Sequence, residues 1–267
     1  MNNRIIQIGA LAVWLFAGGC SNESCLVSEP TVRGEITIQT RADEVGEYRL
    51  LAFNAGNGIC ALNQIIKADG AATTLSLAGG NYKFVTLTGA SQFDLPEAGT
   101  TDGLSLSGAI TLKTDQSLKS CRISKVEEIS IPAASVYAAE LVPATCLVTL
   151  TMVNEAMLPS GQTFACILKN MYNGICPDGS TPGTTLSAGY KLSTEKETIC
   201  FPTNGNAVLT CQMGAGAVQE LVLNKAFLAG KSYTVKLTYK GGFTLKDVEI
   251  KEWNGAGNEH EGDAEIP

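Results

Sequence analysis

Residues 146–152 read Cys-Leu-Val-Thr-Leu-Thr-Met, and this stretch decides the fold class. Every second residue, from Cys146 through Val148 and Leu150 to Met152, is apolar. A period of two is the pattern of a β-strand that buries one face. The stretch therefore predicts one strand of a sheet that packs on a hydrophobic core.

Similar segments continue in both directions from this strand. Strands are expected at residues 35–40, 48–53, 73–78, 82–88, 103–112, 122–131, 163–169, 197–201, 207–213, 219–223, 232–239 and 243–253. Turn residues recur at short intervals between them, which is the rhythm of a β-sandwich. Gly79-Gly80-Asn81 predicts a hairpin between the strands at 73–78 and 82–88. Because no amphipathic helix longer than about two turns is evident, the chain is expected to be all-β.

A stretch without alternation divides these strands into two series. It runs from Ala133 to Leu141, and Pro132 and Pro143 bracket it. Proline at both ends is typical of a break between elements. We therefore expect two β-sandwich domains of similar size, at residues 33–138 and 139–267, the second ending in an acidic tail.

The N-terminus has the order of a secretory signal. Arg4 precedes an apolar run from Ile5 to Phe16, and small residues then lead to Cys20. The run is too short to span a membrane core that needs roughly 20 residues. Residues 1–19 are therefore expected to be a lipoprotein signal peptide, Cys20 the lipid-modified mature N-terminus, and residues 20–32 a tether. The alternative is an ordinary cleaved signal followed by a coincidental cysteine.

The chain is acidic, with a formal charge of −7 from 19 Lys and Arg against 26 Asp and Glu. A chain with so few basic residues lacks the electrostatic footprint of a nucleic-acid-binding protein. It would also be repelled by anionic lipid surfaces. Any membrane attachment is therefore expected to come from the lipid on Cys20, and no nucleic-acid partner is expected.

The chain has nine cysteines, and eight remain if Cys20 carries lipid. Cys146, Cys166 and Cys211 lie at alternating positions among apolar residues, where cysteine commonly acts as a small buried hydrophobe. Buried free thiols are thus one interpretation. Disulfides in an exported protein are the other, and eight cysteines allow 105 pairings among which the sequence does not choose.

The sequence carries few of the residue patterns that are typical of a catalytic site. The single histidine is His260, in the acidic tail, which excludes a histidine-dependent triad or a multi-histidine metal site within one chain. No nucleophile elbow and no phosphate-binding glycine loop is present. Glu127 and Glu128 are neighbours, so on a strand they face opposite ways. We therefore expect no enzyme, no cofactor and no metal site.

Several segments, taken in order, resemble Bacteroidetes fimbrillin-like proteins. They are Thr40-Arg41-Ala42, Tyr48–Phe53 with the glycine turn after it, Leu77–Val85, Leu228–Leu237 and Val248–Gly255, together with the lipoprotein signal. The resemblance implies two tandem transthyretin-like, Greek-key β-sandwiches. It also implies a structural subunit of a cell-surface fimbria, exported as an outer-membrane lipoprotein, whose partners are other fimbrial subunits. An accessory, tip or anchor position is favoured, because the chain has many cysteines and a polar end.

In polymerising members of that family, a trypsin-like protease removes the lipidated segment and the first strand. The groove that opens then accepts a donor strand from another subunit by β-augmentation. Placed on this sequence, the candidate processing residue is Arg41, after the strand expected at 35–40. The alternative is that Arg41 is an ordinary loop arginine. Arg33 precedes the strand, so that cutting there would not free a groove.

The candidate donor segment is the last strand, at 243–253. Its apolar residues are Phe243, Leu245, Val248, Ile250 and Trp253. On a regular strand, Phe243 and Leu245 would lie on one face and Val248 and Ile250 on the opposite face. A bulge near Lys246-Asp247 would bring all four side chains to a common face. The alternative is a terminal hairpin of the protein's own core.

A second functional hypothesis is a monomeric surface lipoprotein that binds a glycan or a host or bacterial adhesion ligand. It requires an exposed aromatic platform, for which Tyr172, Tyr190 and Trp253 are the candidates.

Overall fold

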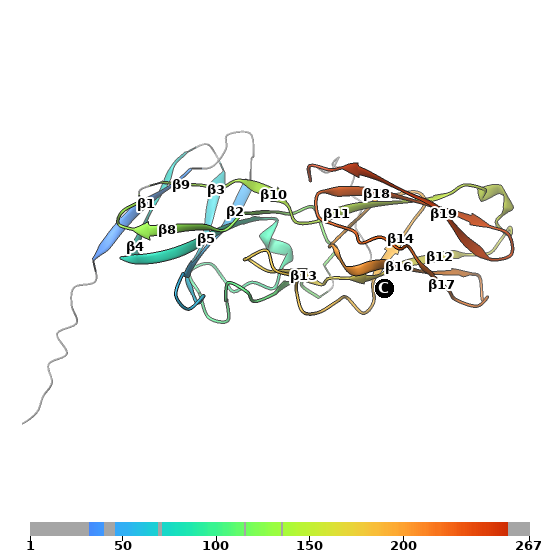
Figure 1. The fold of residues 1–267 in the computed structure, drawn as a ribbon, viewed down its shortest axis with the longest axis horizontal. Helices are drawn as coiled ribbons and strands as arrows, with labels where there is room; N and C mark the ends of the chain where they lie inside the picture. The colour runs from blue at the N-terminus through green and yellow to red at the C-terminus, as the bar shows by residue number, and fades with distance from the viewer. Residues whose placement is uncertain (1–31, 40–45, 69–70, 115, 135, 256–267) are drawn as a thin grey trace, which may run out of the picture. The chain divides into compact units, whose positions relative to one another are not determined.

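A computed structural model describes residues 32–39, 46–68, 71–114, 116–134 and 136–255, which belong to one compact unit beginning at Val32. Within these ranges the chain is all-β, with two single 3-10 turns and no α-helix (Figure 1). This confirms the predicted fold class. The predictions for Cys20, Arg41 and His260 concern positions outside the described residues.

The strands up to residue 143 form two sheets. They are β1 (Arg33–Gln39), β2 (Gly46–Asn54), β3 (Cys60–Ala68), β4 (Thr73–Ala78), β5 (Gly80–Thr88), β7 (Arg122–Ser124), β8 (Glu127–Ile131), β9 (Val136–Ala138) and β10 (Leu141–Pro143). One sheet has the order β4-β1-β9, and the other has the order β10-β7-β5-β2-β3 with β8 also paired to β5. The two sheets face each other across a shared core.

That core follows from the period of two in each strand. Its buried members are Ile36, Ile38, Tyr48, Leu50, Ala52, Ile66, Leu77, Tyr82, Phe84, Ile129, Ile131 and Tyr137. The opposite parity of β2, with Leu51 and Phe53, packs in a second cluster together with Phe93 and Cys121. Because β2 is covered on both faces, it reads as a continuous apolar run rather than an alternating one.

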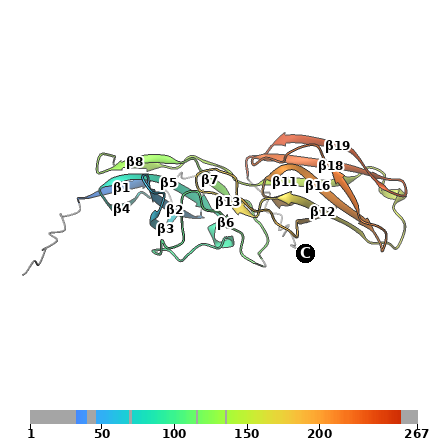
Figure 2. The ribbon, with the colours of Figure 1, turned by 60° about the horizontal axis from the view of Figure 1, so that its bottom comes forward.

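The strands from residue 146 onward form two further sheets. They are β11 (Cys146–Met152), β12 (Phe164–Met171), β14 (Tyr190–Leu192), β15 (Thr198–Cys200), β16 (Thr203–Met213), β17 (Gln219–Val222), β18 (Lys231–Tyr239) and β19 (Phe243–Glu252). The sheet orders are β15-β11-β18-β19 and β14-β12-β16-β17. Figure 2 shows β11, β18 and β19 side by side in one layer. Cys146, Val148 and Leu150 are buried and the residues between them are half-buried, which confirms the pattern read at 146–152.

A small sheet joins the two series of strands. Strand β6 (Ile110–Thr111) pairs with β13 (Gly174–Ile175) in antiparallel register. A Cβ atom at Gly174 would lie 2.2 Å from the Ile110 carbonyl oxygen. The pairing therefore depends on a residue without a side chain at position 174.

Three expectations about strands are wrong. Strands β4 and β5 form no hairpin, because β4 pairs with β1 and β5 pairs with β2 and β8 in the facing sheet. At Gly79 the chain crosses from one sheet to the other, and the Gly79 N–H donates to the Val32 carbonyl. Residues 103–112 are mostly turns that contain only β6, and the sequence reading missed β3.

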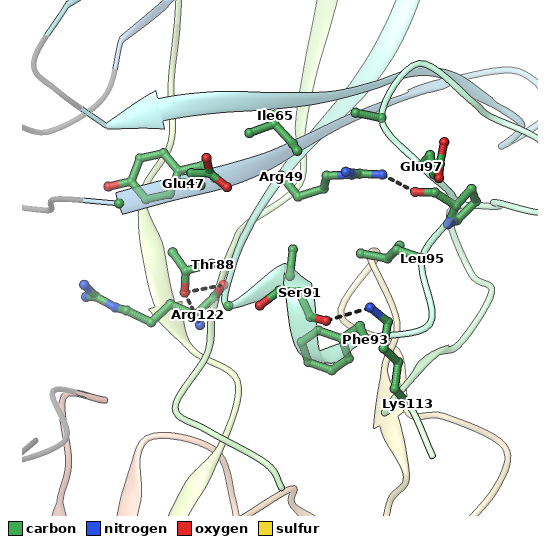
Figure 3. A pocket seen from close by; sticks show the side chains of 16 residues that line it. Glu47, Arg49, Ile65, Thr88, Ser91, Phe93, Leu95, Glu97, Lys113 and Arg122 are labelled. Carbon is green, nitrogen blue, oxygen red and sulfur yellow. Dashed lines mark hydrogen bonds between the residues drawn. The ribbon is translucent and has the colours of Figure 1, made fainter. Parts of the chain in front are cut away.

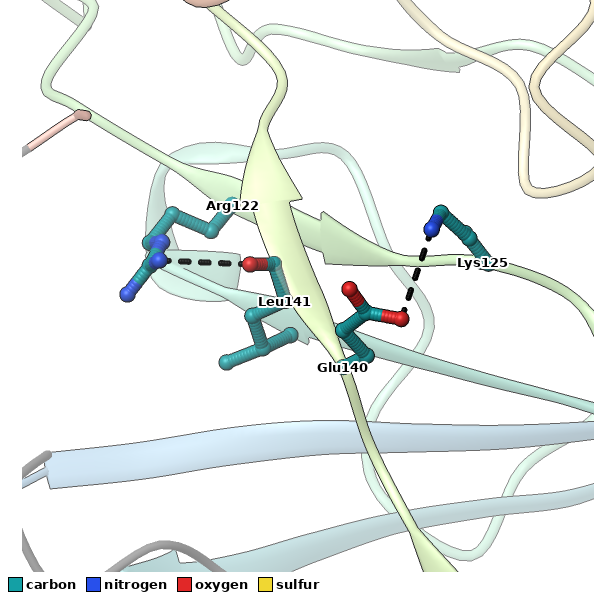
Figure 4. Close-up of polar contacts among 4 residues, drawn as sticks. All are labelled: Arg122, Lys125, Glu140 and Leu141. Atoms are coloured by element: carbon teal, nitrogen blue, oxygen red, sulfur yellow. Dashed lines mark hydrogen bonds and ion pairs between the residues drawn. The ribbon is translucent and has the colours of Figure 1, made fainter. Parts of the chain in front are cut away.

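The stretch expected to separate the domains contains two short strands. Strand β9 pairs with β1, and β10 pairs with β7. Arg122 of β7 donates to the Leu141 carbonyl at 3.2 Å, and Lys125 forms an exposed ion pair with Glu140 at 3.3 Å (Figure 4). All pairing with the first two sheets therefore ends at Pro143, while the domain limits at 138 and 139 stay a prediction.

Candidate functional site

Strand β1 is the centre of its sheet. It pairs along Arg33–Ile38 with β4 in antiparallel register and along Thr37–Gln39 with β9 in parallel register. The parallel partner lies about a hundred residues further along the chain, so no local turn fixes this pairing. Both hydrogen-bonding edges of β1 have a neighbouring strand, β4 along Arg33–Ile38 and β9 along Thr37–Gln39 alone.

The side chains of β1 close the core of the first sandwich. Ile36 is fully buried and Ile38 is 3% exposed, whereas Thr37 between them is half-buried and the flanking Glu35 and Gln39 are exposed. At Gly34 an added Cβ would lie 2.7 Å from side-chain atoms of Ile131 and Pro132. The strand thus fills a slot that is shaped to its backbone and to two isoleucine side chains.

The neighbours of β1 are also held by contacts that do not involve β1. The Tyr137 hydroxyl of β9 lies 3.1 Å from the hydroxyls of both Thr86 and Ser124 in the facing sheet. The Tyr82 hydroxyl of β5 donates to the Ala78 carbonyl of β4 at 3.0 Å. These bonds tie β9 and β4 to the facing sheet on either side of β1.

The predicted processing residue, Arg41, lies outside the described residues. In the sequence it follows Gln39, the last residue of β1, and precedes Gly46, the first of β2. Arg33 is the first residue of β1, and its guanidinium donates to the Ser76 carbonyl at 3.3 Å. A cut after Arg33 would therefore leave the body of β1 in place.

The predicted donor segment forms the edge strand β19. It pairs with β18 as an antiparallel hairpin, and the register shifts so that Lys246 has no opposite residue. The bulge expected near Lys246-Asp247 is thereby confirmed. Phe243 is buried, Leu245 and Val248 are half-buried, and Ile250 is 46% exposed. The role of these residues as a donor strand stays a prediction.

The aromatic platform of the second hypothesis is not formed. Tyr190 is fully buried and Tyr172 is 8% exposed, so neither presents a ring to solvent. Trp253 is half-buried just after β19, where its main-chain N–H donates to the Gly230 carbonyl at 2.9 Å. The expectation of an exposed platform at these positions is therefore wrong for both tyrosines.

A cavity of about 1080 Å³, which the sequence reading missed, opens beside β2, β5 and residues 88–98. Arg49 on its wall is 7% exposed and donates to Asn63 Oδ1 at 2.5 Å and to the Pro96 carbonyl. Figure 3 shows it pointing toward the segment that carries Leu95 and Glu97. Burial lowers the pKa of Arg49. In the sequence, this buried polar site is indicated by a charged residue, Arg49, inside the apolar run Tyr48–Phe53.

Among the described residues, no helix has the length and hydropathy needed to cross a membrane. In the same part of the chain, no group of three or more His, Cys, Asp or Glu side chains is placed to hold a metal ion.

The fold and site define an all-β protein with facing sheets whose first strand is a central, enclosed one. Several solved structures share this fold. The fimbrial anchor protein Mfa2 from Porphyromonas gingivalis is similar with a TM-score of 0.55 and 13% identity, over 83% of this chain and 98% of that one. No protein-family model matches the sequence, and no curated protein matches it.

Two Bacteroides structures are similar as well. A Bacteroides thetaiotaomicron protein described provisionally as polysaccharide-binding has a TM-score of 0.60 and 11% identity, over 82% of this chain and 96% of that one. A Bacteroides ovatus protein described provisionally as an adhesin has a TM-score of 0.54 and 11% identity, over 82% and 93% of the two chains. These similarities confirm the fold implied by the resemblance to fimbrillin-like proteins.

Proposed function

We propose that this chain is a structural subunit of a cell-surface fimbria, in an accessory, tip or anchor position, that assembles by strand exchange. The observation that carries the proposal is the place of β1. An N-terminal strand that is paired on both edges and fills a core slot can be replaced by a strand of another subunit. Such β-augmentation uses main-chain hydrogen bonds for affinity and alternate side chains for specificity.

Loss of β1 would leave a groove that strongly favours the binding of another strand. The inner edges of β4 and β9 would carry unpaired N–H and C=O groups, and the core around Ile36 and Ile38 would be open. Unpaired edges readily pair with another chain. The bonds of Tyr137 and Tyr82 support a groove that keeps its walls when its central strand is absent.

The two ends of the chain take different roles in this proposal. Lipid on Cys20 holds the protein at the outer membrane, and a cut at Arg41 releases the anchor together with β1. Without the cut, the protein stays at the membrane as a base or accessory subunit. The segment from Phe243 to Trp253 is the candidate donor to a neighbouring subunit, because β19 already lies at a sheet edge.

Cleavage by an arginine-specific protease tests the proposal, because the chain has only Arg4, Arg33, Arg41, Arg49 and Arg122. We expect cleavage after Arg41 to release β1 and to yield ladders that resist heat and detergent. Arg41→Gln should prevent both changes, whereas the matched control Arg33→Gln should behave as the wild type. A stable monomer after clean cleavage at Arg41 would refute strand exchange between copies of this chain, as in a shaft subunit.

A further inference from the structure

Four cysteines form two pairs that lie directly opposite each other across antiparallel strands. Cys166 of β12 faces Cys211 of β16, and Cys146 of β11 faces Cys200 of β15. All four are fully buried in the core of the second series of strands. The seven described cysteines are buried and carry free thiols in this structure, and the choice between thiols and disulfides in the exported protein stays a prediction.

Direct opposition has a geometric consequence. Opposed residues in an antiparallel pair have Cα atoms about 4.5 or 5.5 Å apart, and disulfides join Cα atoms about 4.4–6.8 Å apart. The Cα separation expected of such a pair therefore lies within the range that a disulfide spans. Cys60 lacks this arrangement, because it faces Phe53 across β2 and β3.

The pair at 166 and 211 is also oriented for bond formation. The Cys166 and Cys211 Sγ atoms lie 3.5 Å apart in hydrogen-bonding contact. In the other pair, burial and hydrogen bonding with Cys146 raise the pKa of Cys200. Its thiols also contact the main chain, since Cys146 Sγ donates to the Phe201 carbonyl and Cys200 Sγ donates to the Thr198 carbonyl, each at 3.6 Å. The second pair thus serves as an internal comparison with the same register, in which main-chain carbonyls compete for the thiols.

The contact between the sulfur atoms also separates their acidities. Hydrogen bonding from Cys166 lowers the pKa of Cys211, while the same bond, together with burial, raises the pKa of Cys166. A thiolate is the attacking species in thiol–disulfide exchange. In the folded chain the two thiols are therefore coupled through this contact.

We propose that Cys166 and Cys211 are oxidised to a cross-strand disulfide in the exported protein, an inference that rests on the export included in the proposed function. The oxidant is a disulfide compound of an oxidising compartment. The thiolate of one of the two cysteines attacks one oxidant sulfur, forming a mixed disulfide and releasing the other sulfur as a thiol. The thiolate of the second cysteine then attacks the protein sulfur of this mixed disulfide and releases the second thiol. Two electrons and two protons pass to the oxidant.

The timing and effect of this bond follow from its place in the core. Because both sulfurs are fully buried, the exchange belongs to folding after export, before β12 and β16 close. The bond then fixes the register of β12 and β16 and closes the long loop between them. A cross-link of this loop length is expected to raise the Tm by on the order of 10 °C.

Disulfide mapping of the full-length wild-type chain tests the proposal without any variant. The protein is expressed with export to an oxidising compartment, unfolded in acid, blocked with N-ethylmaleimide, digested without reductant and analysed by mass spectrometry. We expect a linked peptide pair containing Cys166 and Cys211. Linkage of both opposed pairs also supports the proposal. Linkage of only Cys146 with Cys200, another partner for Cys166, or free thiols at both positions would overturn it.

A thermal measurement provides a second readout. Reductant should lower the Tm of the exported wild type by on the order of 10 °C. The shift should decrease by the contribution of this bond in the double variant Cys166→Ala/Cys211→Ala, and the matched Cys146→Ala/Cys200→Ala should retain that contribution. A shift of unchanged size without Cys166 and Cys211 would contradict the proposal. Neither readout uses cleavage or ladder formation, so failure here is distinguishable from failure of the fimbrial function.

Discussion

At the scale of single residues, the first sandwich depends on a buried polar contact inside an apolar strand. Arg49 and Asn63 bond to each other, and Asn63 also donates to the Glu97 and Thr100 carbonyls. The Gly99 N–H donates in turn to the Asn63 carbonyl at 2.7 Å. Buried polar groups are costly unless they are bonded. This contact therefore holds the segment around residues 96–100 against β3.

A buried thiol gives the protein a specific response to alkaline pH. Burial raises the pKa of Cys121 from 9.0 to about 12. Between these values the unfolded state loses the thiol proton while the folded state keeps it. The free energy of unfolding is therefore unaffected by this group below pH 9 and falls above it, by up to about 1.4 kcal/mol per pH unit.

Urea unfolding of the wild type and of Cys121→Ala at several pH values measures this effect. The two proteins differ by a constant amount below pH 9, from the change in packing. Between pH 9 and 12 the free energy of unfolding of the wild type should fall more steeply than that of Cys121→Ala. The difference in slope should correspond to the release of close to one proton on unfolding. Parallel curves over that range would show that Cys121 is not protected from ionisation.

Burial of single aromatic residues was beyond the sequence reading. Tyr190 follows the glycine-rich stretch at residues 170–187, and this context suggests exposure. The structure places it on β14, beside β12, with its ring in the core. A three-residue strand leaves too little periodicity to reveal its buried face. The alternation at 146–152, by contrast, spans enough residues to identify both strand and face.

At the scale of elements, local signals predict strands better than they predict strand partners. The alternation at 243–253 reveals both β19 and its bulge, because each is recorded in one continuous segment. The two glycines at 79 and 80 mark a sharp turn correctly. They do not reveal that the chain crosses between sheets at this turn. The crossing arises because β4 pairs with β1 in one sheet and β5 pairs with β2 in the other.

The short pairing of β6 with β13 gives an element-scale prediction. Gly174→Ala should lower the free energy of unfolding by about 1–3 kcal/mol. An added Cβ would meet the Ile110 carbonyl oxygen and two further backbone atoms within 2.9 Å, so β6 and β13 must separate. Chemical denaturation measures the loss, and amide exchange at Leu112, which donates to the Asn173 carbonyl, should become faster.

A nearby glycine supplies the matched control. A Cβ at Gly183 would meet no atom within 4 Å, and its backbone is not in the left-handed region. Gly183→Ala should therefore change stability by less than about 0.5 kcal/mol. Equal effects of the two substitutions would show that close approach at Gly174 is not what maintains the pairing.

At the scale of the whole molecule, the candidate site is a product of topology. The slot for β1 is built by β4, β9 and the facing sheet, which come from residues 46 to 143. The sequence predicts the strand and its two isoleucines, but the parallel pairing with β9 is a long-range contact that no local pattern records. The position of Arg41 acquires meaning only once β1 is seen to be enclosed on both edges.

The last prediction concerns that enclosure directly. A fluorescent peptide of residues 32–39, present in excess during cleavage at Arg41, should compete with donor strands and bind the protein at one copy per chain. Ile36 and Ile38 are buried in the slot, and each buried isoleucine contributes about 1.5–3 kcal/mol. A peptide with Ile36→Asp and Ile38→Asp should therefore bind at least about 100-fold more weakly. Fluorescence anisotropy measures both affinities.

The uncleaved protein is the internal control for this experiment. Its own β1 is covalently attached and competes at a high effective concentration, so the peptide should not bind. Binding to cleaved and uncleaved protein with equal affinity would place the peptide on an outer edge, such as β3 or β19, rather than in the slot of β1. Selective binding after cleavage would instead establish that the groove stays formed without its strand, which is the physical requirement for assembly by strand exchange.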